Sequence, residues 1–227
     1  MNIDSAVLDR YTAGAQLRQE SLCCPVDYDN SLLAILPQEI IERDYGCGDP
    51  SRYVRAGETV LDLGSGGGKI CYMAAQLVGA RGRVIGIDMN GDMLALARKY
   101  QSAMAARLGG NRVEFLKGKI QDLALDVQAV QDWLTLNPVR SEGDRERLRQ
   151  YENKQRSTQP LIQDASIDLV ISNCVLNLVA DSEKQQMIEE VYRVLKPGGR
   201  VAISDIISDR PVPAGMKNDP ELWSGCL

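Results

Sequence analysis

The sequence contains no histidine and only one phenylalanine among its 227 residues. Without histidine there is no Ser-His-Asp or Cys-His nucleophile pair, no histidine general base and no zinc site with a histidine ligand. Because only 5% of the residues are aromatic, the core must be mostly aliphatic. A reaction with a soft nucleophile that needs no general base therefore suits this composition better than activation of an oxygen or nitrogen acceptor.

Long apolar runs and targeting signals are also missing. The longest apolar stretch, Leu169 to Ala180, is short and interrupted by polar residues, so we expect no transmembrane segment. The N-terminus has an early Asp4 and no basic-then-apolar pattern, which argues against secretion. Basic residues number 26 and acidic residues 31, a balance that argues against nucleic-acid binding. We expect a cytoplasmic protein that binds neither membranes nor nucleic acid.

The six cysteines are too sparse for a disulfide scaffold, and no two of them form a CxxC pair. In a reducing compartment a cysteine is by default a small buried hydrophobe, with metal ligation or catalysis as the alternative. The cysteines are Cys23, Cys24, Cys47, Cys71, Cys174 and Cys226.

Strand and helix patterns alternate through the centre of the chain. Strands are predicted over residues 58–63, 83–88, 112–116, 167–172 and 200–205, and helices over 69–78, 91–108 and 182–195. A turn over Lys196 to Gly199 precedes the last strand. This alternation requires right-handed βαβ crossovers, so we predict an α/β fold with a doubly wound, mostly parallel, Rossmann-like sheet.

The predicted organisation has three parts. Residues 1–52 are expected to form a helical, cysteine-bearing N-terminal segment, residues 53–206 the main domain, and residues 207–227 a separate C-terminal region. An insertion of about residues 125–160 interrupts the main domain. Its stretch from Arg140 to Arg156 holds six basic and four acidic residues, and this mixture predicts a solvated helical excursion or a flexible loop.

A glycine cluster follows the first predicted strand, from Gly64 to Gly68. Such glycines let the backbone approach a ligand at a helix N-terminus. The dinucleotide fingerprint GxGxxG fails here because its last position is Lys69. An acid just before the loop, Asp62, also suits a cationic amino group better than a pyrophosphate.

The end of the second strand indicates which ligand this is. Asp88 is placed to bind both hydroxyls of a ribose, and Met89 to lie against an adenine face. A nucleoside with an amino-acid tail and no phosphate is S-adenosylmethionine. The alternative, a glycine turn and a capping acid, must explain Asp62 and Asp88 separately.

Residues 57–205 resemble the class I S-adenosylmethionine-dependent methyltransferases, through LDLGSGGG, the acid after the second strand and LKPGGR. The resemblance implies that Gly64, Ser65 and Gly66 approach the methionine moiety. It also places Ile120 and Gln121 at the adenine edge, with the Gln121 amide oxygen as acceptor where many members have a carboxylate. Lys69 occupies a position that is often basic in related proteins.

Three of the cysteines are candidates for chemistry. Cys174 follows the fourth strand at its carboxyl end, where such folds bind ligands, and Cys47 stands between two glycines. Cys226 lies near the end of the chain. Three thiolates are a good ligand set for a soft trivalent centre, although each cysteine taken alone is better explained as a buried hydrophobe.

The series YGCG, DLGSGGGKICY, SNCVLNLV and PELWSGC, together with RYTAGAQL near the start, resembles the arsenite S-adenosylmethionine methyltransferases. The resemblance implies that Cys47, Cys174 and Cys226 bind As(III) and that Tyr45 packs near the sulfonium. It further implies a disulfide relay through Cys23 or Cys24, with thioredoxin or glutathione as reductant. Family members continue beyond the segment with Cys226, so residues 207–227 would begin a truncated arsenic-binding region.

Other positions and other functions remain open from the sequence. Asn173 is expected to shape the cofactor pocket through its backbone, Cys71 to belong to the core and Trp223 to be a packing anchor. The expected protein is a monomer whose substrate is arsenite or an arsenite–thiol conjugate. The alternatives are a methyltransferase for another small molecule, such as a quinone or a sterol-like lipid, and a non-catalytic thiol-based arsenic or metal sensor.

Overall fold

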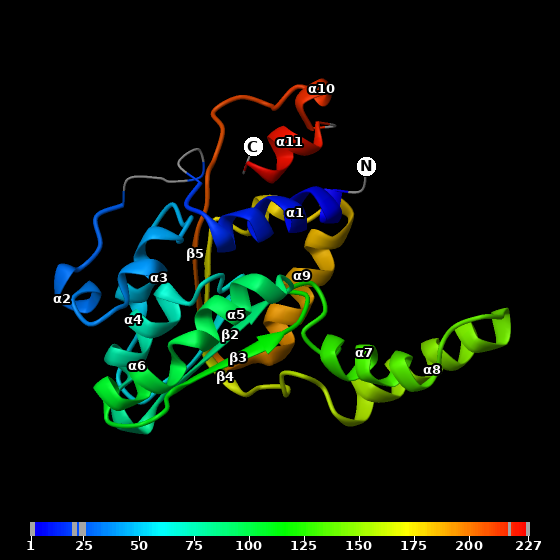
Figure 1. Cartoon of the computed structure of the whole chain (residues 1–227), viewed down its shortest axis with the longest axis horizontal. Coiled ribbons are helices and arrows are strands. Elements are labelled where there is room, and N and C mark those ends of the chain that lie inside the picture. Colours follow the sequence, from blue (N-terminus) through cyan, green and yellow to red (C-terminus); the bar gives the residue numbers. More distant parts are fainter. Residues whose placement is uncertain (1–2, 20–21, 23–25, 218, 226–227) are drawn as a thin grey trace.

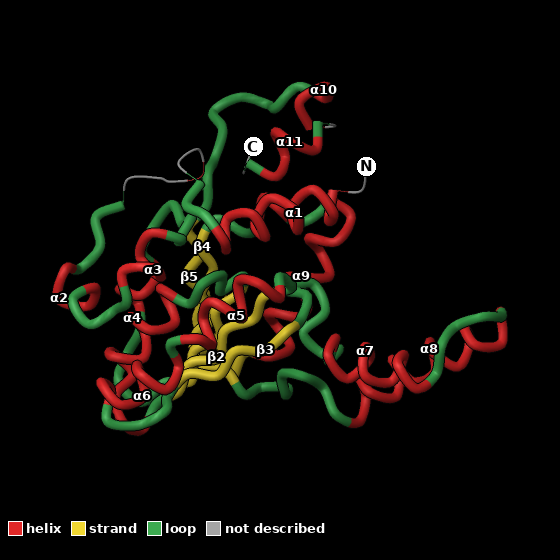
Figure 2. Tube along the Cα trace, viewed as in Figure 1, coloured by secondary structure: helices red, strands yellow, loops and turns green. Residues whose placement is uncertain are grey.

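A five-stranded parallel sheet forms the centre of the computed structural model, which describes residues 3–19, 22, 26–217 and 219–225. Its strand order is β3-β2-β1-β4-β5. The strands are β1 (Thr59–Leu63), β2 (Arg83–Asp88), β3 (Val113–Lys117), β4 (Ile167–Asn173) and β5 (Leu195–Ser204). Helices flank this sheet (Figures 1 and 2), which confirms the predicted doubly wound α/β fold.

Neighbouring residues of β1 point to opposite faces of the sheet and enter two separate cores. Val60 packs into a core with residues of α4 (Lys69–Val78), α5 (Gly91–Lys99) and α6 (Gln101–Leu108). Leu61 and Leu63 pack into the other core, with residues of α9 (Asp181–Val194). Because both faces are covered, the central strand β4 is almost continuously apolar and buried.

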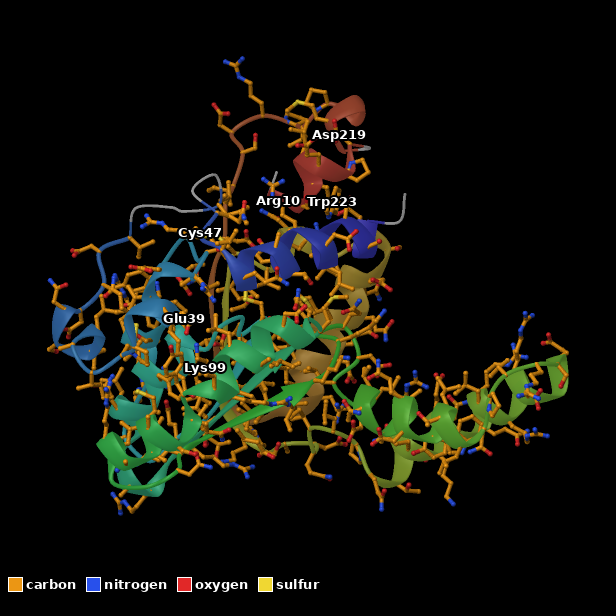
Figure 3. The ribbon with its side chains drawn as sticks, in the orientation of Figure 1. Arg10, Glu39, Cys47, Lys99, Asp219 and Trp223 are labelled. Carbon is orange, nitrogen blue, oxygen red and sulfur yellow. A yellow bond between two sulfur atoms is a disulfide. The ribbon has the colours of Figure 1, made fainter. Side chains whose placement is uncertain are left out.

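The N-terminal segment contains α1 (Ile3–Gln16), α2 (Asn30–Leu33), α3 (Gln38–Glu42) and the 3₁₀ turn η2 (Pro50–Tyr53). Helix α1 lies between α5 and α11 (Pro220–Ser224), near the top of Figure 1, and α10 (Ala214–Lys217) precedes α11. The guanidinium of Arg10 donates to the Glu221 carbonyl (2.8 Å) and to the Ser224 hydroxyl (3.2 Å), at the junction labelled in Figure 3. Both ends of the described chain are therefore joined above the sheet.

The insertion at about residues 125–160 is helical, which is one of the two alternatives that the sequence left open. It forms α7 (Val127–Leu136) and α8 (Glu142–Thr158), which extend away from the body of the domain (Figure 1). Trp133 of α7 stacks on Tyr151 of α8, with ring centroids 5.1 Å apart. Arginine and acidic side chains pair along the exposed surface of α8.

Two predicted element boundaries were wrong. The helix expected over 91–108 is divided at Tyr100, where Tyr100 and Lys99 both bond the Glu39 carboxylate of α3; Glu39 and Lys99 are labelled in Figure 3. The last strand begins at Leu195 instead of residue 200. Ile167 pairs with Leu195 and Leu169 with Arg200, so the expected turn is a bulge within β5.

The remaining short elements are the 3₁₀ turns η3 (Gly79–Arg81) and η4 (Leu176–Leu178). None of the helices in the described ranges has both the length and the apolar character needed to span a membrane.

Candidate active site

A cavity lies at the carboxyl ends of β1, β2 and β4, where parallel α/β sheets bind ligands. Helix α1 contributes Val7, Leu8 and Tyr11 to its wall. The sequence-predicted residues that line it are Tyr45, Asp62, Gly64, Ser65, Gly66, Asp88, Met89, Ile120, Gln121, Asn173 and Cys174. The fold therefore brings together residues that are distant in the chain.

Two glycines of the loop after β1 have positive φ angles, a conformation that favours glycine. Gly64 has φ +73°, and a β-carbon there would lie 2.5 Å from Cγ2 of Val175. Gly66 has φ +51°, but a β-carbon there would meet no atom within 4 Å. The Gly64 backbone thus packs against Val175, just after β4, whereas Gly66 lies in an open part of the cavity wall.

Asp62 is a buried carboxylate in the cavity wall, with an exposed fraction of 2%. Burial raises the pKa of Asp62 to about 7, and the charges of Asp44 and Asp88 add to the effect. The thiol of Cys71 donates to Asp62 Oδ2 (3.2 Å) and partly opposes this shift. A buried acid with a raised pKa at a cavity is a good receptor for a cationic group.

Asp88 ends β2 and both of its oxygens accept backbone hydrogen bonds. Oδ2 accepts from the amide of Gly66 and Oδ1 from that of Asn90, each at 2.8 Å. Burial raises the pKa of Asp88, and these hydrogen bonds oppose the increase. The carboxylate is held in one orientation at the point where the glycine loop meets the end of β2.

Ser65 provides independent support for a polar ligand in this cavity. Its hydroxyl oxygen is buried and has no hydrogen-bond partner, the single case among the described side chains. Buried polar groups are normally hydrogen-bonded, so an orphaned hydroxyl in a cavity wall indicates a missing partner. An acid for an amino group, an acid for a ribose and an unpaired hydroxyl together fit S-adenosylmethionine.

The region after β3 forms another side of the cavity. Ile120 is buried in the wall, and Gln121 donates its amide nitrogen to Glu183 Oε2 (3.0 Å) on α9. This bond fixes which atom of the Gln121 amide is the donor. The amide oxygen is then the acceptor that the sequence expectation assigned to the adenine edge.

Tyr45 connects the cavity to α1. It is buried, its hydroxyl donates to the Gly14 carbonyl (2.9 Å), and its ring meets Tyr11 edge-on at 6.1 Å between centroids. It therefore lines the cavity and also fixes the end of α1 above it.

The prediction that Lys69 binds the cofactor does not agree with its position. Its ammonium group forms an ion pair with Asp44 and lies 3.6 Å from the ring centroid of Tyr28. It lines a second cavity near Gln38 and Ile41, and is not among the described residues that line the first one. The Lys69 side chain therefore pairs with the partly buried Asp44 and does not enter the first cavity.

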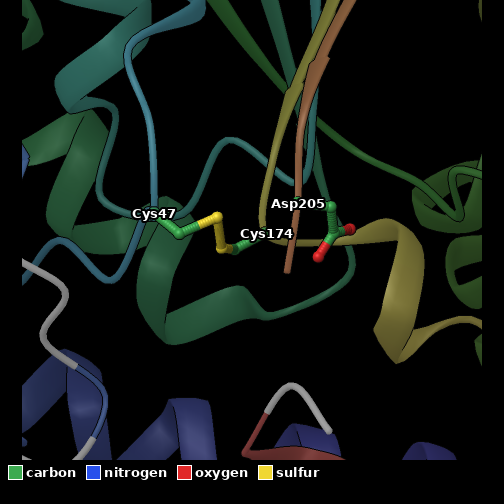
Figure 4. A group of neighbouring side chains, drawn as sticks. All are labelled: Cys47, Cys174 and Asp205. Carbon is green, nitrogen blue, oxygen red and sulfur yellow. A yellow bond between two sulfur atoms is a disulfide. The ribbon is translucent and has the colours of Figure 1, made fainter. Parts of the chain in front are cut away.

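Cys47 and Cys174 form a disulfide bond beside the cavity, although they are 127 residues apart in sequence (Figure 4). The side chain of Asn173 fixes the loop that carries Cys47. Its Oδ1 accepts from the amides of Cys47 and Gly48, both at 3.0 Å, and its Nδ2 donates to the Gly48 carbonyl (2.7 Å). Asn173 was expected to act through its backbone, and the structure assigns this role to its side chain.

The other cysteines fall into two groups. Cys23, Cys24 and Cys226 lie outside the described residues. Cys71 is fully buried and unbonded to another cysteine, which confirms the prediction that it belongs to the core. Trp223 is buried and donates to the Leu178 carbonyl (3.2 Å), as expected of a packing anchor.

Sequence analysis did not identify two parts of the site. The face of α1 over the cavity includes Tyr11 of the RYTAGAQL motif, but no cavity-lining role was predicted for this residue. Asp205 is different, because it ends the last predicted strand at the same edge of the sheet as Cys174. That position was a usable signal, and a carboxylate oxygen of Asp205 lies within 4.8 Å of both sulfurs of the disulfide.

Comparison with known proteins agrees with this geometry. Residues 55–140 and 140–227 match the family described as "Methyltransferase domain". The chain belongs to this methyltransferase family. A crystal structure of an arsenic(III) S-adenosylmethionine methyltransferase from Chlamydomonas reinhardtii is 32% identical, with a TM-score of 0.65 over 89% of this chain and 58% of that chain. The methyltransferase is therefore of the class I S-adenosylmethionine type in fold.

Curated relatives of the methyltransferase include arsenite methyltransferases from three distant organisms. The one from Aquipseudomonas alcaligenes is 35% identical over 91% of this chain and 51% of its own length. Those from Halobacterium salinarum and Mus musculus are 38% and 36% identical, over 80% and 88% of this chain and 36% and 44% of their own lengths. The chain thus spans about half the length of the relatives it matches, or less.

Proposed function

We propose that this methyltransferase transfers a methyl group from S-adenosylmethionine to trivalent arsenic held by cysteine thiolates. The observation that carries the proposal is the position of Cys174, which lines the cofactor cavity and is bonded to Cys47. A thiol in the wall of such a cavity, with a second thiol bonded to it, suits a thiophilic substrate. The similarity to arsenite methyltransferases supports the same conclusion.

Different residues of the cavity would bind different parts of the cofactor. Asp62 accepts the amino group and Ser65 donates to a polar atom of the amino-acid tail, with Gly64 and Gly66 below it. Asp88 binds the ribose, while Met89, Ile120 and Gln121 surround the adenine. When bound, S-adenosylmethionine supplies an electrophilic methyl group for attack by the lone pair of arsenic. Tyr45 excludes water from the reacting end.

The thiols bind the substrate and also supply electrons. The thiols of Cys47, Cys174 and Cys226 bind As(III) through sulfur. Each thiol gives up its proton, which leaves with an arsenic-bound hydroxide as water. Methylation formally oxidises arsenic from the trivalent to the pentavalent state. Two thiolates then return two electrons to arsenic as they join in a disulfide, and the Cys47–Cys174 bond is suited to this step. Cys23 or Cys24 would relay the disulfide toward the surface.

The cycle needs a reductant outside the chain. We propose that thioredoxin or glutathione reduces the disulfide, each bond consuming two thiols and leaving the reductant oxidised. We further propose that the protein works as a cytoplasmic monomer and that arsenite, or an arsenite–thiol conjugate, is its substrate. Residues 207–227 would then begin the arsenic-binding region.

Arsenic speciation tests the proposal. The protein is incubated with arsenite, S-adenosylmethionine and a dithiol reductant, and methylated arsenic is measured. Wild type should form it, whereas Cys174→Ser should not, while still binding S-adenosylhomocysteine. Tight arsenite binding without turnover would indicate a sensor, and neither binding nor methylation would indicate another acceptor. Either result would overturn arsenite methylation.

A further inference from the structure

Three potential ligand atoms meet at the rim of the cavity. The sulfurs of Cys47 and Cys174 and a carboxylate oxygen of Asp205 all lie within 4.8 Å of one another. They come from different parts of the fold, namely the loop after α3, the end of β4 and the segment just after β5 (Figure 4). The disulfide does not use the carboxylate, so its position beside two sulfurs needs a separate explanation.

The carboxylate of Asp205 is held in place by backbone groups. Oδ2 accepts from the amide of Asn177 (3.2 Å) and Oδ1 from that of Ile206 (2.8 Å). No lysine or arginine of the described ranges forms an ion pair with it. After reduction of the disulfide, one fixed anion and two ionisable thiols would share a small space without an ion-paired cation. This arrangement favours a bound positive ion.

The backbone at Cys174 is also unusual. Its φ is +57°, in the left-handed region that a cysteine rarely adopts, and its amide donates to the Ser204 carbonyl (2.8 Å). This hydrogen bond ties it to the end of β5, next to Asp205. Residues kept in such conformations tend to occur at binding sites, where the neighbouring structure enforces them.

We propose that the reduced protein binds a thiophilic divalent cation, Zn²⁺ in the cell, through Cys47, Cys174 and Asp205. Two thiolates and a carboxylate match the ligand preference of Zn²⁺, and its fourth tetrahedral position stays open to water. Reduction by a dithiol breaks the disulfide and gives two thiols plus the oxidised reductant. Zn²⁺ then replaces the two thiol protons, so the cation and the disulfide exclude each other.

Occupation of this site would regulate the thiols. A bound cation protects both sulfurs from oxidation, because neither is free to form the disulfide. It also competes with a trivalent metalloid for the same thiolates. The competition rests on the proposed function, but cation binding does not, because it is measured without arsenic or cofactor.

The binding test uses the full chain, reduced with a phosphine that is then removed without air. To isolate the site, the background variant Cys23→Ser/Cys24→Ser/Cys226→Ser is titrated beside wild type. Zn²⁺ binding is measured against a chromophoric chelator, and Cd²⁺ binding by the thiolate charge-transfer absorption. We expect one tightly bound ion per reduced chain in both proteins and none in the oxidised chain, a comparison that needs no variant of the site itself.

Substitutions then identify the ligands. Asp205→Asn should weaken Zn²⁺ binding tenfold or more while keeping the thiolate absorption of bound Cd²⁺. Cys174→Ser should abolish tight binding, and the control Asp209→Asn, which removes one exposed carboxylate from the same segment, should change nothing. Unchanged affinity in Asp205→Asn, or loss of the ion in the background variant, would overturn the site. Because arsenic takes no part, failure here leaves the proposed methylation intact.

Discussion

The raised pKa of Asp62 makes cofactor binding depend on pH. Burial holds this carboxyl half-protonated near pH 7, whereas an amino group prefers the ionised form. In the empty protein the ionised fraction is about 0.09 at pH 6 and about 0.91 at pH 8, and apparent affinity scales with that fraction. We therefore predict that S-adenosylhomocysteine, which carries the same amino group, binds roughly tenfold more weakly at pH 6 than at pH 8.

Ionisation of Asp62 favours cofactor binding but lowers the stability of the folded protein. Because the pKa of Asp62 is higher in the folded chain than its ordinary value of 3.8, ionisation opposes folding. Stability of the empty protein should be greatest below pH 4 as far as this group is concerned, and decline as pH rises toward about 7. The full difference corresponds to about 4 kcal/mol, which the ligand's amino group offsets.

Calorimetric titration between pH 5.5 and 8.5 provides the assay. At pH 6, in buffers of different ionisation enthalpy, binding should release about one proton. Asp62→Asn should bind weakly with a flattened pH dependence, whereas Asp88→Asn should keep a pH dependence that moves to lower pH, because the charge of Asp88 helps to raise the pKa of Asp62. An affinity independent of pH, or the same slope in Asp62→Asn, would refute the assignment of the amino group to Asp62.

Three further substitutions test the structural account. Asn173→Ala should lower the free energy of unfolding by about 1–3 kcal/mol, because the Cys47 loop loses its hydrogen bonds. For the same reason the disulfide should shift toward the reduced form when the protein is equilibrated with a dithiol. An unchanged equilibrium would contradict this role of Asn173. Gly64→Ala should lower the free energy of unfolding in urea more than Gly66→Ala, because only the former clashes with a neighbour; equal losses would argue against the loop geometry. Lys69→Met should lower the free energy of unfolding by about 1–3 kcal/mol, because the partly buried Asp44 loses its ion-pair partner and keeps only its hydrogen bonds from Tyr28 and Gly46. Adding Asp44→Asn to Lys69→Met should recover part of the lost stability. If no stability is recovered, the Lys69–Asp44 ion pair is excluded as the cause of the loss.

The sheet could be predicted because its signals are local. Apolar runs such as Ile167–Ser172 and the glycine loop after Leu63 are read directly from neighbouring residues, and each falls in the expected element. Helix α5 ends earlier than predicted, at Lys99, whose side chain bonds Glu39, 60 residues away in sequence. A tertiary contact of that kind leaves no trace in helical periodicity.

The candidate site was predictable to the extent that topology alone determines it. Asp62, Asp88 and Cys174 follow parallel strands, so the edge they share follows from the strand pattern. Lys69 was misplaced because its orientation depends on Asp44 and Tyr28, neither of which the glycine motif contains. The side-chain role of Asn173 likewise depends on a loop that begins more than 120 residues earlier.

A structure of the reduced protein with arsenite and S-adenosylhomocysteine bound tests the central claim most directly. We expect arsenic bonded to the sulfurs of Cys174 and Cys47. Its lone pair should face the thioether sulfur of S-adenosylhomocysteine in the cavity between Asp62 and Asp88. Arsenic bound away from that cavity, with Cys47 and Cys174 taking no part, would contradict it.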